Sequence, residues 1–191
     1  MFSELIAQEL GWSAEMSERI RFAAPMHDIG KLGIPDSILQ KPGRLSDDEF
    51  EIMKTHTLIG SVILADSDSP MMRLTQQIAL YHYERWDGTG YPNGIQGTEI
   101  PESARIVAVA DVFDALSHDR VYRPAFPQDR VLDMMQEGNG THFDADRCAV
   151  RDAVGAFYPA IEIVDDRYVD FVARQPDWRT WLADDFFGAG M

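Results

Sequence analysis

The sequence predicts an all-α fold, an irregular helical bundle. In one segment after another, apolar residues recur at the three- and four-residue spacing of an amphipathic helix, and glycines and prolines separate these segments. No alternating apolar and polar run is long enough for a convincing strand, and the sequence has neither internal repeats nor low-complexity segments. Its 191 residues leave room for one domain and a short extension.

The first third of the chain carries clear signals for helix starts and stops. Residues 2–10 show helical apolar spacing and end at a glycine, and Ser13 is placed to cap a second helix that reaches about residue 26. Residues 30–44 are interrupted by glycines and prolines, which predicts a loop. Ser46 and Glu49 form a capping box, so we expect a third helix from there to about residue 65.

The rest of the chain alternates predicted helices with one irregular segment. Residues 87–94 read Asp-Gly-Thr-Gly-Tyr-Pro-Asn-Gly and must form a loop, because glycine and proline interrupt any regular element. We expect helices over residues 72–83, 101–116, 128–136 and 146–157. From about residue 159, tryptophans and phenylalanines stand among aspartates. The sequence therefore predicts a main domain over residues 1–158 and an acidic, aromatic-containing C-terminal extension over residues 159–191.

The charge balance excludes two classes of partner. The chain has 17 Lys and Arg against 32 Asp and Glu, a net charge of −15. Such a surface argues against binding to a nucleic acid polymer and against docking on an anionic membrane. A single cysteine, Cys148, rules out an internal disulfide framework, and the sequence shows no secretion signal or membrane-spanning run. We therefore expect a cytoplasmic protein.

Histidine and aspartate residues suggest a metal site built between helices. The candidates come from separate predicted elements, and they are His27 with the adjacent Asp28, His56, His82 and Asp111. An aspartate inside a helix as apolar as residues 105–116 is costly to bury unless a cation or hydrogen bonds neutralise it. Facing helices of a bundle supply metal ligands in this way. Imidazole and carboxylate without thiolate suit iron, manganese, zinc or nickel.

A purely structural reading of each residue stands beside this one. A His-Asp dipeptide arises by chance in a chain so rich in aspartate, and His56 could be a helix histidine with satisfied hydrogen bonds. Asp111 could act as a structural hydrogen-bond hub. Taken one at a time, the residues leave both readings open.

Longer motifs surround these candidates in a fixed order. They are Pro25-Met-His-Asp-Ile-Gly-Lys-Leu-Gly-Ile-Pro-Asp-Ser-Ile-Leu-Gln-Lys-Pro-Gly-Arg-Leu45, Met53-Lys-Thr-His56 with Gly60, His82-Tyr-Glu-Arg-Trp-Asp-Gly-Thr-Gly-Tyr-Pro-Asn-Gly94, Ala104-Arg-Ile-Val-Ala-Val-Ala-Asp-Val-Phe-Asp-Ala-Leu116 and Arg120-Val-Tyr-Arg123. From about Leu5 to about Asp146 the chain resembles the HD-GYP subgroup of the HD-domain phosphohydrolases. The residues beyond that point carry none of the resemblance.

The resemblance implies a metal-dependent phosphodiesterase that hydrolyses the bacterial messenger cyclic di-GMP to pGpG or on to GMP. It implies two divalent transition-metal ions, iron, manganese, zinc or nickel, with Asp28 bridging them. The implied ligands are His27, Asp28, His56, His82 and Asp111. Lys31 joins Asp28 as a catalytic residue, because its ammonium can meet a phosphate oxygen as a point charge. Two such metals lower the pKa of a bound water and stabilise charge on phosphorus.

The resemblance also implies substrate contacts outside the metal site. By analogy with the family, Lys31, Arg120, Arg123 and Tyr91 bind the dinucleotide, and the Gly90-Tyr91-Pro92 loop can dock a diguanylate cyclase (GGDEF) domain. Without the family, the two arginines are equally well read as solvated loop residues. Tyr91 is equally well read as a tyrosine that packs a tight turn against the bundle.

The chain departs from the family pattern in two places. The family reads His-His-Glu before the Gly-Tyr-Pro loop, whereas here Tyr83 stands in place of the second histidine, a ligand. The family's upstream Glu-x-x-x-His helix has no counterpart after Met1, so we expect either a fragment that follows a receiver or sensor domain, or a lost metal-binding helix. The alternative function is a catalytically impaired module that senses a ligand or binds a protein partner, and a third is a phosphohydrolase acting on another nucleotide.

Overall fold

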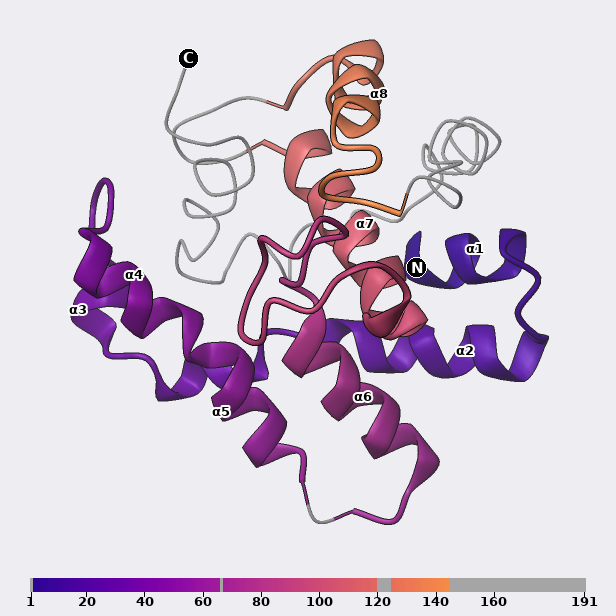
Figure 1. Cartoon of the computed structure of the whole chain (residues 1–191), viewed down its shortest axis with the longest axis horizontal. Helices are drawn as coiled ribbons and strands as arrows, with labels where there is room; N and C mark the ends of the chain where they lie inside the picture. Colours follow the sequence, from indigo (N-terminus) through magenta and orange to yellow (C-terminus); the bar gives the residue numbers. More distant parts are fainter. Residues whose placement is uncertain (1, 66, 120–124, 145–191) are drawn as a thin grey trace.

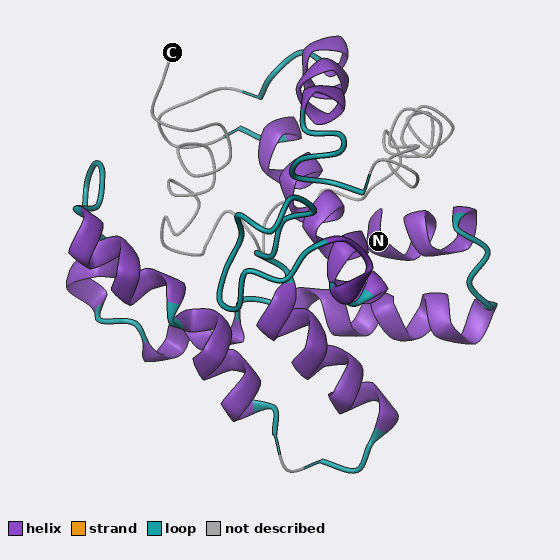
Figure 2. Ribbon diagram, in the orientation of Figure 1, coloured by secondary structure: helices purple, strands orange, loops and turns teal. Residues whose placement is uncertain are grey.

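The computed structural model describes residues 2–65, 67–119 and 125–144, and in this part of the chain it is helical without a β-strand (Figure 2). The predicted all-α fold is confirmed. The α-helices are α1 (Phe2–Glu9), α2 (Ala14–Ala23), α3 (Asp36–Leu39), α4 (Asp47–Lys54), α5 (His56–Ile63), α6 (Pro70–Tyr81), α7 (Glu102–Ser117) and α8 (Gln128–Glu137). The short 3-10 helices are η1 (Ala24–Met26), η2 (Ile29–Gly33) and η3 (Gly97–Glu99).

Helices α6 and α7 form the centre of the bundle. Helix α6 packs against α2, α5 and α7, and α7 also contacts α1 and α8. Figure 1 shows α4 and α5 on one side of α6 and the antiparallel pair α1–α2 on the other. The core between α1, α2, α6 and α7 consists of Ala7, Ile20, Ala23, Ile78, Ile106 and Val107. Burial of this apolar surface is the main force that holds the four helices together.

Helix α7 is buried on most of its faces. Its buried residues include Ala104, Val107 and Ala108 near the start and Val112 and Phe113 near the middle. A second core continues from the end of α7 into α8 and the turn after it. This surrounding apolar wall explains the strongly hydrophobic sequence of α7, and it makes Asp111 on the same helix exceptional.

The first two predicted helices and both predicted caps are confirmed. The Ser13 side chain accepts a hydrogen bond from the Met16 amide and caps α2. Ser46 and Glu49 form the capping box at the start of α4, with the Ser46 amide donating to the Glu49 carboxylate at 2.7 Å. Helix α2 ends at Ala23, and the 3-10 turn η1 continues the chain to the His27–Asp28 pair.

The prediction of a plain loop over residues 30–44 is wrong. The segment contains η2 and the one-turn helix α3, which begins directly after Pro35. Proline fixes a backbone angle that suits a helix start, so this residue begins a helix here rather than only interrupting one. Ile34 and Ile38 from this segment pack with Met53 in a small core of their own.

The single helix predicted from Ser46 to about residue 65 is instead two helices. They are α4 and α5, separated at Thr55. Three successive side chains, Thr55, His56 and Thr57, bond to carbonyl oxygens three residues earlier. Such side-chain bonds compete with the regular helix pattern and bend it. As a result, His56 begins a helix instead of lying in the middle of one.

The later helices agree with prediction within a few residues. Helix α6 ends at Tyr81, two residues before the predicted end, and α8 ends one residue after it. The helix predicted over residues 146–157 and the extension over 159–191 lie outside the described residues, as do Arg120 and Arg123. In the described part of the chain, no helix combines the length and the apolar character needed to cross a lipid bilayer.

Candidate metal centre

The His27–Asp28 pair lies at a junction that a glycine makes possible. A Cβ atom on Gly30 would lie 1.8 Å from the carbonyl oxygen of His56 and 2.4 Å from the amide of Gly60. A real Cβ cannot approach so closely, and only glycine lets η2 pack directly against α5. This close packing brings Asp28 next to His56.

Three imidazoles at the site are oriented by the same local device. His27 Nδ1 bonds to the carbonyl of Ala24 at 2.7 Å, and His56 Nδ1 bonds to the carbonyl of Met53 at 2.8 Å. His82 Nδ1 bonds to carbonyls of the last turn of α6, each at 3.1 Å. Because a carbonyl oxygen only accepts, each Nδ1 carries the proton, and each Nε2 is left with a lone pair in the neutral ring. Metal-binding histidines in proteins are held in this way.

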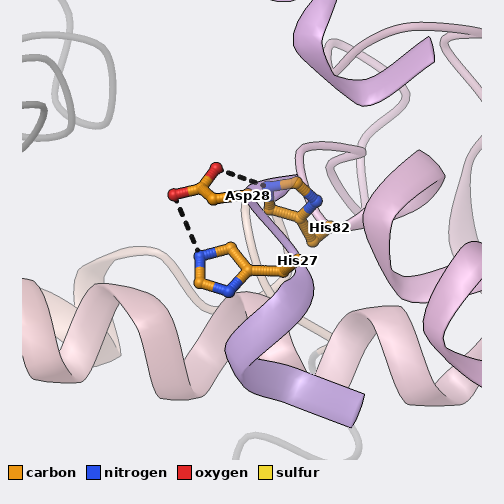
Figure 3. A group of neighbouring side chains, drawn as sticks. All are labelled: His27, Asp28 and His82. Carbon is orange, nitrogen blue, oxygen red and sulfur yellow. Dashed lines mark ion pairs between the residues drawn. The ribbon is translucent and has the colours of Figure 1, made fainter. Parts of the chain in front are cut away.

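Asp28 lies between the three Nε2 atoms. Its Oδ2 is 3.2 Å from His27 Nε2, and its Oδ1 is 3.4 Å from His56 Nε2 and 3.7 Å from His82 Nε2. Figure 3 shows the carboxylate with one oxygen facing His27 and the other facing His82. His27, Asp28 and His82 alone place three possible ligand atoms within 4.8 Å of one another.

The polar atoms at this point lack hydrogen-bond partners. Seven buried side-chain atoms make no hydrogen bond in the part of the chain that the structure describes, and four of them lie at this centre: His27 Nε2, Asp28 Oδ1, His56 Nε2 and His82 Nε2. Buried polar groups without partners are rare in native proteins and call for an explanation. Bound divalent cations would satisfy these atoms, since the set contains only nitrogen and oxygen donors.

Asp111 reaches the same centre from α7. Its Oδ1 lies 3.7 Å from His27 Nε2, and its side chain is largely buried. Burial raises the pKa of this carboxyl group, and the neighbouring His27 opposes the rise. The structure therefore brings together all five residues that the sequence proposed as ligands.

Charges at the centre are strongly coupled. Burial opposes ionisation of Asp28, but Lys31 and His27 outweigh it and hold its pKa well below the usual range. The Lys31 ammonium donates to Asp28 Oδ2 at 2.8 Å. Burial likewise opposes protonation of His27, yet Asp28 and Asp111 raise its pKa to about 9. Because a metal binds the neutral ring, a cation bound at His27 competes with a proton.

The other two imidazoles are neutral. Burial lowers the pKa of His56 to about 3 and also lowers the pKa of His82. Neutral rings are the form that binds a metal. The centre can thus offer two neutral imidazoles and one ionised carboxylate near neutral pH.

Tyr83, at the position of the family's second histidine, lies against the ligands as an aromatic ring. Its ring centroid is 4.5 Å from that of His82 and 5.3 Å from that of His56. The Tyr83 ring also stacks on the ring of Tyr91, with the centroids 4.8 Å apart and the ring planes 12° from parallel. The Gly-Tyr-Pro loop therefore borders the metal centre through this ring pair.

A buried glutamate that sequence reasoning did not single out organises this loop. Glu84 is 2% exposed, and its Oε1 accepts a hydrogen bond from the Asn93 amide at 2.7 Å. Burial raises the pKa of Glu84, and the backbone amides of residues 93–95 oppose the rise. The sequence feature that could have identified Glu84 is its position directly after His82 and Tyr83, at the start of the loop.

Arg85 and His142 are a second pair that sequence reasoning missed. Arg85 Nη1 lies 2.9 Å from His142 Nδ1, a contact across 57 positions of the chain. The backbone brings them together, because the Trp86 and Asp87 amides bond to the carbonyls of His142 and Thr141. No local pattern in the sequence signals a pairing over such a distance.

Comparisons with known proteins agree with the predicted family and with this helical fold. The HD domain family matches residues 1–146. A cyclic di-GMP phosphodiesterase of Thermotoga maritima is 53% identical over 135 residues, which are 71% of this chain and 37% of that protein. A cyclic di-GMP phosphodiesterase of Vibrio cholerae is 51% identical over 160 residues, 81% of this chain and 30% of that protein. A 3'3'-cGAMP-specific phosphodiesterase of V. cholerae is 42% identical over 144 residues, 75% of this chain and 28% of that protein.

A solved structure shares the fold. The crystal structure of a cyclic GMP-AMP specific phosphodiesterase from V. cholerae, V-cGAP3, matches with a TM-score of 0.56 at 18% identity, covering 85% of this chain and 42% of that one.

The helical fold and its His/Asp centre define a protein of the HD domain class. The chain belongs to the HD domain family and, within it, to the HD-GYP group, as the sequence predicted. It spans about a third of the length of the curated relatives that it matches.

Proposed function

We propose that this chain is the catalytic module of a metal-dependent phosphodiesterase that hydrolyses cyclic di-GMP to pGpG or GMP. One observation carries the proposal: three imidazole Nε2 atoms and a carboxylate oxygen converge in a buried place without hydrogen-bond partners in the described residues. The names of relatives that share up to 53% of aligned residues supply the substrate class.

The ligands fit a pair of divalent cations. The residues that would hold them are His27, His56, His82, Asp28 and Asp111. Asp28 lies between the imidazoles, with Oδ2 facing His27 and Oδ1 facing His56 and His82. The absence of thiolate favours iron or manganese, with zinc or nickel as the alternatives. Such cations supply Lewis acidity, which makes water more acidic and neutralises charge on a phosphate ester.

The chain's own residues bind and orient the substrate. Asp28 stays ionised because of its low pKa, and it holds the Lys31 ammonium at the edge of the centre. From there Lys31 can pair with a phosphate oxygen of the substrate. Tyr91 lines the neighbouring pocket. The second phosphate is proposed to bind Arg120 and Arg123, two residues that lie outside the described part of the chain.

Metal analysis with an activity assay tests the proposal. The purified chain should contain or take up iron or manganese and should form pGpG from cyclic di-GMP when supplied with Fe(II) or Mn(II). Asp28→Ala should abolish both metal uptake and hydrolysis. Lack of metal binding and of pGpG with either ion would refute the proposal.

A second candidate function is a module that senses a ligand or docks a partner without hydrolysis. Tyr83 favours it, because an aromatic ring stands where the family has an imidazole ligand. In this case the Gly-Tyr-Pro loop would bind a diguanylate cyclase (GGDEF) domain. Tyr83→His separates the two functions, since a gain in metal content together with newly gained hydrolysis would show that the natural chain is the impaired form.

The larger protein and its location follow as further proposals. Because the relatives are about three times as long as the matched segment, we propose a receiver or sensor domain before the HD-GYP module. A bacterial second messenger as substrate and a single cysteine both favour the cytoplasm.

A further inference from the structure

Helix α5 carries an apolar face that its neighbours in the described part of the bundle leave exposed. The residues that form it are Leu58, Val62 and Ile63, which are 47%, 75% and 49% exposed. Leu58 and Val62 lie about one helical turn apart, and Ile63 follows Val62, so the three side chains share one side of the helix. Contiguous apolar side chains on a surface mark a place where a partner binds.

The metal centre lies on the other side of this helix. The buried residues of α5 are His56, Thr57 and Gly60. His56 is a candidate metal ligand that faces Asp28, and Gly60 packs against Gly30 of η2. A partner bound to the apolar face therefore leaves the metal centre uncovered.

The apolar face continues from α5 onto η2. Leu32 of η2 is 78% exposed. The next residue, Gly33, faces the side chain of Ile59, because a Cβ atom added at Gly33 would lie 2.9 Å from Ile59 Cγ2. Ile59 directly follows Leu58 on α5, so it connects Leu32 to the apolar face. Figure 1 shows α5 at the edge of the bundle, with α6 on its inner side.

The apolar face also lacks charge. Residues 55–65 contain no Asp, Glu, Lys or Arg, although these four residue types make up 26% of the chain. In contrast, the preceding helix α4 contains Asp47, Asp48, Glu49 and Glu51. The face is thus an uncharged area on a molecule whose net charge is −15.

Charge selects the partner that fits this face. A net charge of −15 repels nucleic acids and anionic membranes. A basic protein is drawn to the acidic surfaces of the molecule rather than to an uncharged one. An uncharged apolar face is complemented by another such face, and a second copy of the chain presents the same one. Identical faces pack around a twofold axis, which is the commonest symmetry of homo-oligomers.

We infer that the apolar face joins two copies of the chain in a symmetric dimer, with α5 of one copy packed on α5 of the other. Leu58 and Val62 form a four-residue ridge of the kind by which packed helices interlock. The repulsion between the two acidic copies is screened beyond about 8 Å at physiological ionic strength. Because the contacting helices carry no charged side chain, this repulsion is weakest where the copies meet.

Sedimentation equilibrium of the full chain, with and without Mn(II), tests the dimer. A contact centred on one short helix is at the small end of protein interfaces, which predicts a Kd on the order of 10 µM. The average mass should therefore rise from 21.6 kDa toward twice this value as the concentration increases from about 1 µM to about 300 µM. A chain that stays monomeric over this range overturns the inference.

Charge substitutions locate the interface. Val62→Glu places a carboxylate from each copy in the apolar contact and should raise Kd at least about 100-fold. Val62→Ile keeps the contact apolar and should stay within about threefold of the natural chain. Phe22→Glu is the matched control, because Phe22 is 54% exposed on α2, outside the face, and this variant should dimerise like the natural chain. Equal weakening by Val62→Glu and Phe22→Glu would show that the face is not the interface.

Salt distinguishes this dimer from one that is held by ion pairs. Salt screens the repulsion between the acidic copies and leaves the apolar contact intact, so Kd should fall several-fold between about 0.05 M and about 0.5 M NaCl. A Kd that rises with salt would mean that charges outside the face hold the copies together, and it would overturn the inference.

The metal centre provides a check on folding. Because the face lies away from the centre, Val62→Glu should keep the Mn(II) content and the circular dichroism of the natural chain, and Leu58→Glu replaces it if it does not. The dimer goes beyond the proposed function and does not depend on it. A natural chain that dimerises without hydrolysing cyclic di-GMP refutes only the proposed function, whereas one that hydrolyses it and stays monomeric refutes only the dimer.

Discussion

At the scale of single residues, the direction of each imidazole decides what the centre can do. His27, His56 and His82 all bond through Nδ1 to a backbone carbonyl three or four residues earlier. Each carbonyl belongs to the turn that precedes its histidine, so helix geometry alone fixes the ring and directs Nε2 toward Asp28. The three imidazoles are consequently oriented by the local backbone.

Lys31 is expected to act on the substrate rather than on the metal. Lys31→Met removes a charge-assisted hydrogen bond that is worth roughly 1.5–3 kcal/mol. We therefore expect kcat/KM for cyclic di-GMP to fall about 10- to 150-fold, whereas metal content stays the same because bound cations neutralise Asp28. Inductively coupled plasma analysis measures the metal content, and steady-state kinetics measure kcat/KM. The control is Lys41→Met, which removes the ion pair between Lys41 and Glu49. Equal losses of kcat/KM in both variants would contradict the role of Lys31 in substrate binding.

His142 predicts a pH dependence of folding stability. The pKa of His142 is about 3 in the folded protein and 6.5 for a free ring. Between these two values the ring is protonated in the unfolded chain and neutral in the folded one. Stability from this group is complete above pH 6.5 and is lost as pH falls toward 3. His142→Gln should remove up to about 1.4 kcal/mol per pH unit from the slope. Urea unfolding of the natural chain and of His142→Gln at pH 7, 6 and 5 gives the free energy of unfolding at each pH. The same pH dependence in both proteins would refute the prediction.

At the scale of elements, the contact between η2 and α5 determines whether the site assembles. Gly30 faces backbone atoms of His56 and Gly60, which cannot move aside without breaking α5. Nearby Gly33 faces only the side chain of Ile59, whose outer carbons can rotate away. Two glycines of one short helix therefore differ sharply in the substitutions that they tolerate.

Gly30→Ala should disrupt both fold and metal site. Overpacking against rigid backbone costs about 1–3 kcal/mol or more, and here it also separates Asp28 from His56. We expect a clear fall in the urea midpoint and loss of Mn(II) binding. Gly33→Ala is the matched control, with metal binding retained. Retention of metal binding in Gly30→Ala would show that the close packing does not position the ligands.

Local sequence predicts elements well where its signals are local. The caps at Ser13 and Ser46 act over three residues, and the structure contains both. The break at Thr55 was missed because it depends on side-chain bonds to carbonyls that no periodicity reveals. The 3-10 turn after Asp28 was missed because its glycine serves packing against α5 rather than a turn.

At the scale of the whole molecule, the centre links elements that are far apart in sequence. His27 and Asp28 follow α2, His56 begins α5, His82 follows α6, and Asp111 lies on α7. A cation bound by these residues therefore connects four parts of the bundle. Binding to the folded state alone must stabilise that state.

Metal loading should raise the melting temperature. Metal at 100 times its Kd adds about 2.7 kcal/mol, which for a chain of this size corresponds to roughly 5–11 °C. Differential scanning fluorimetry with Mn(II), and again after addition of a chelator, measures the shift and its reversal. In Asp28→Ala the shift should vanish. A similar shift in that variant would indicate binding elsewhere on the acidic surface.

The sequence by itself determined the helical class, the caps and the identity of the five candidate ligands, because helix periodicity, capping and motif order are all encoded locally. Tertiary structure decided how the ligands meet, with Nε2 atoms and Asp28 Oδ1 sharing one buried place. It also decided that Tyr83 stacks on Tyr91 and that Arg85 meets His142 across 57 positions. Such contacts depend on the packing of whole helices and loops, and no short stretch of sequence specifies them.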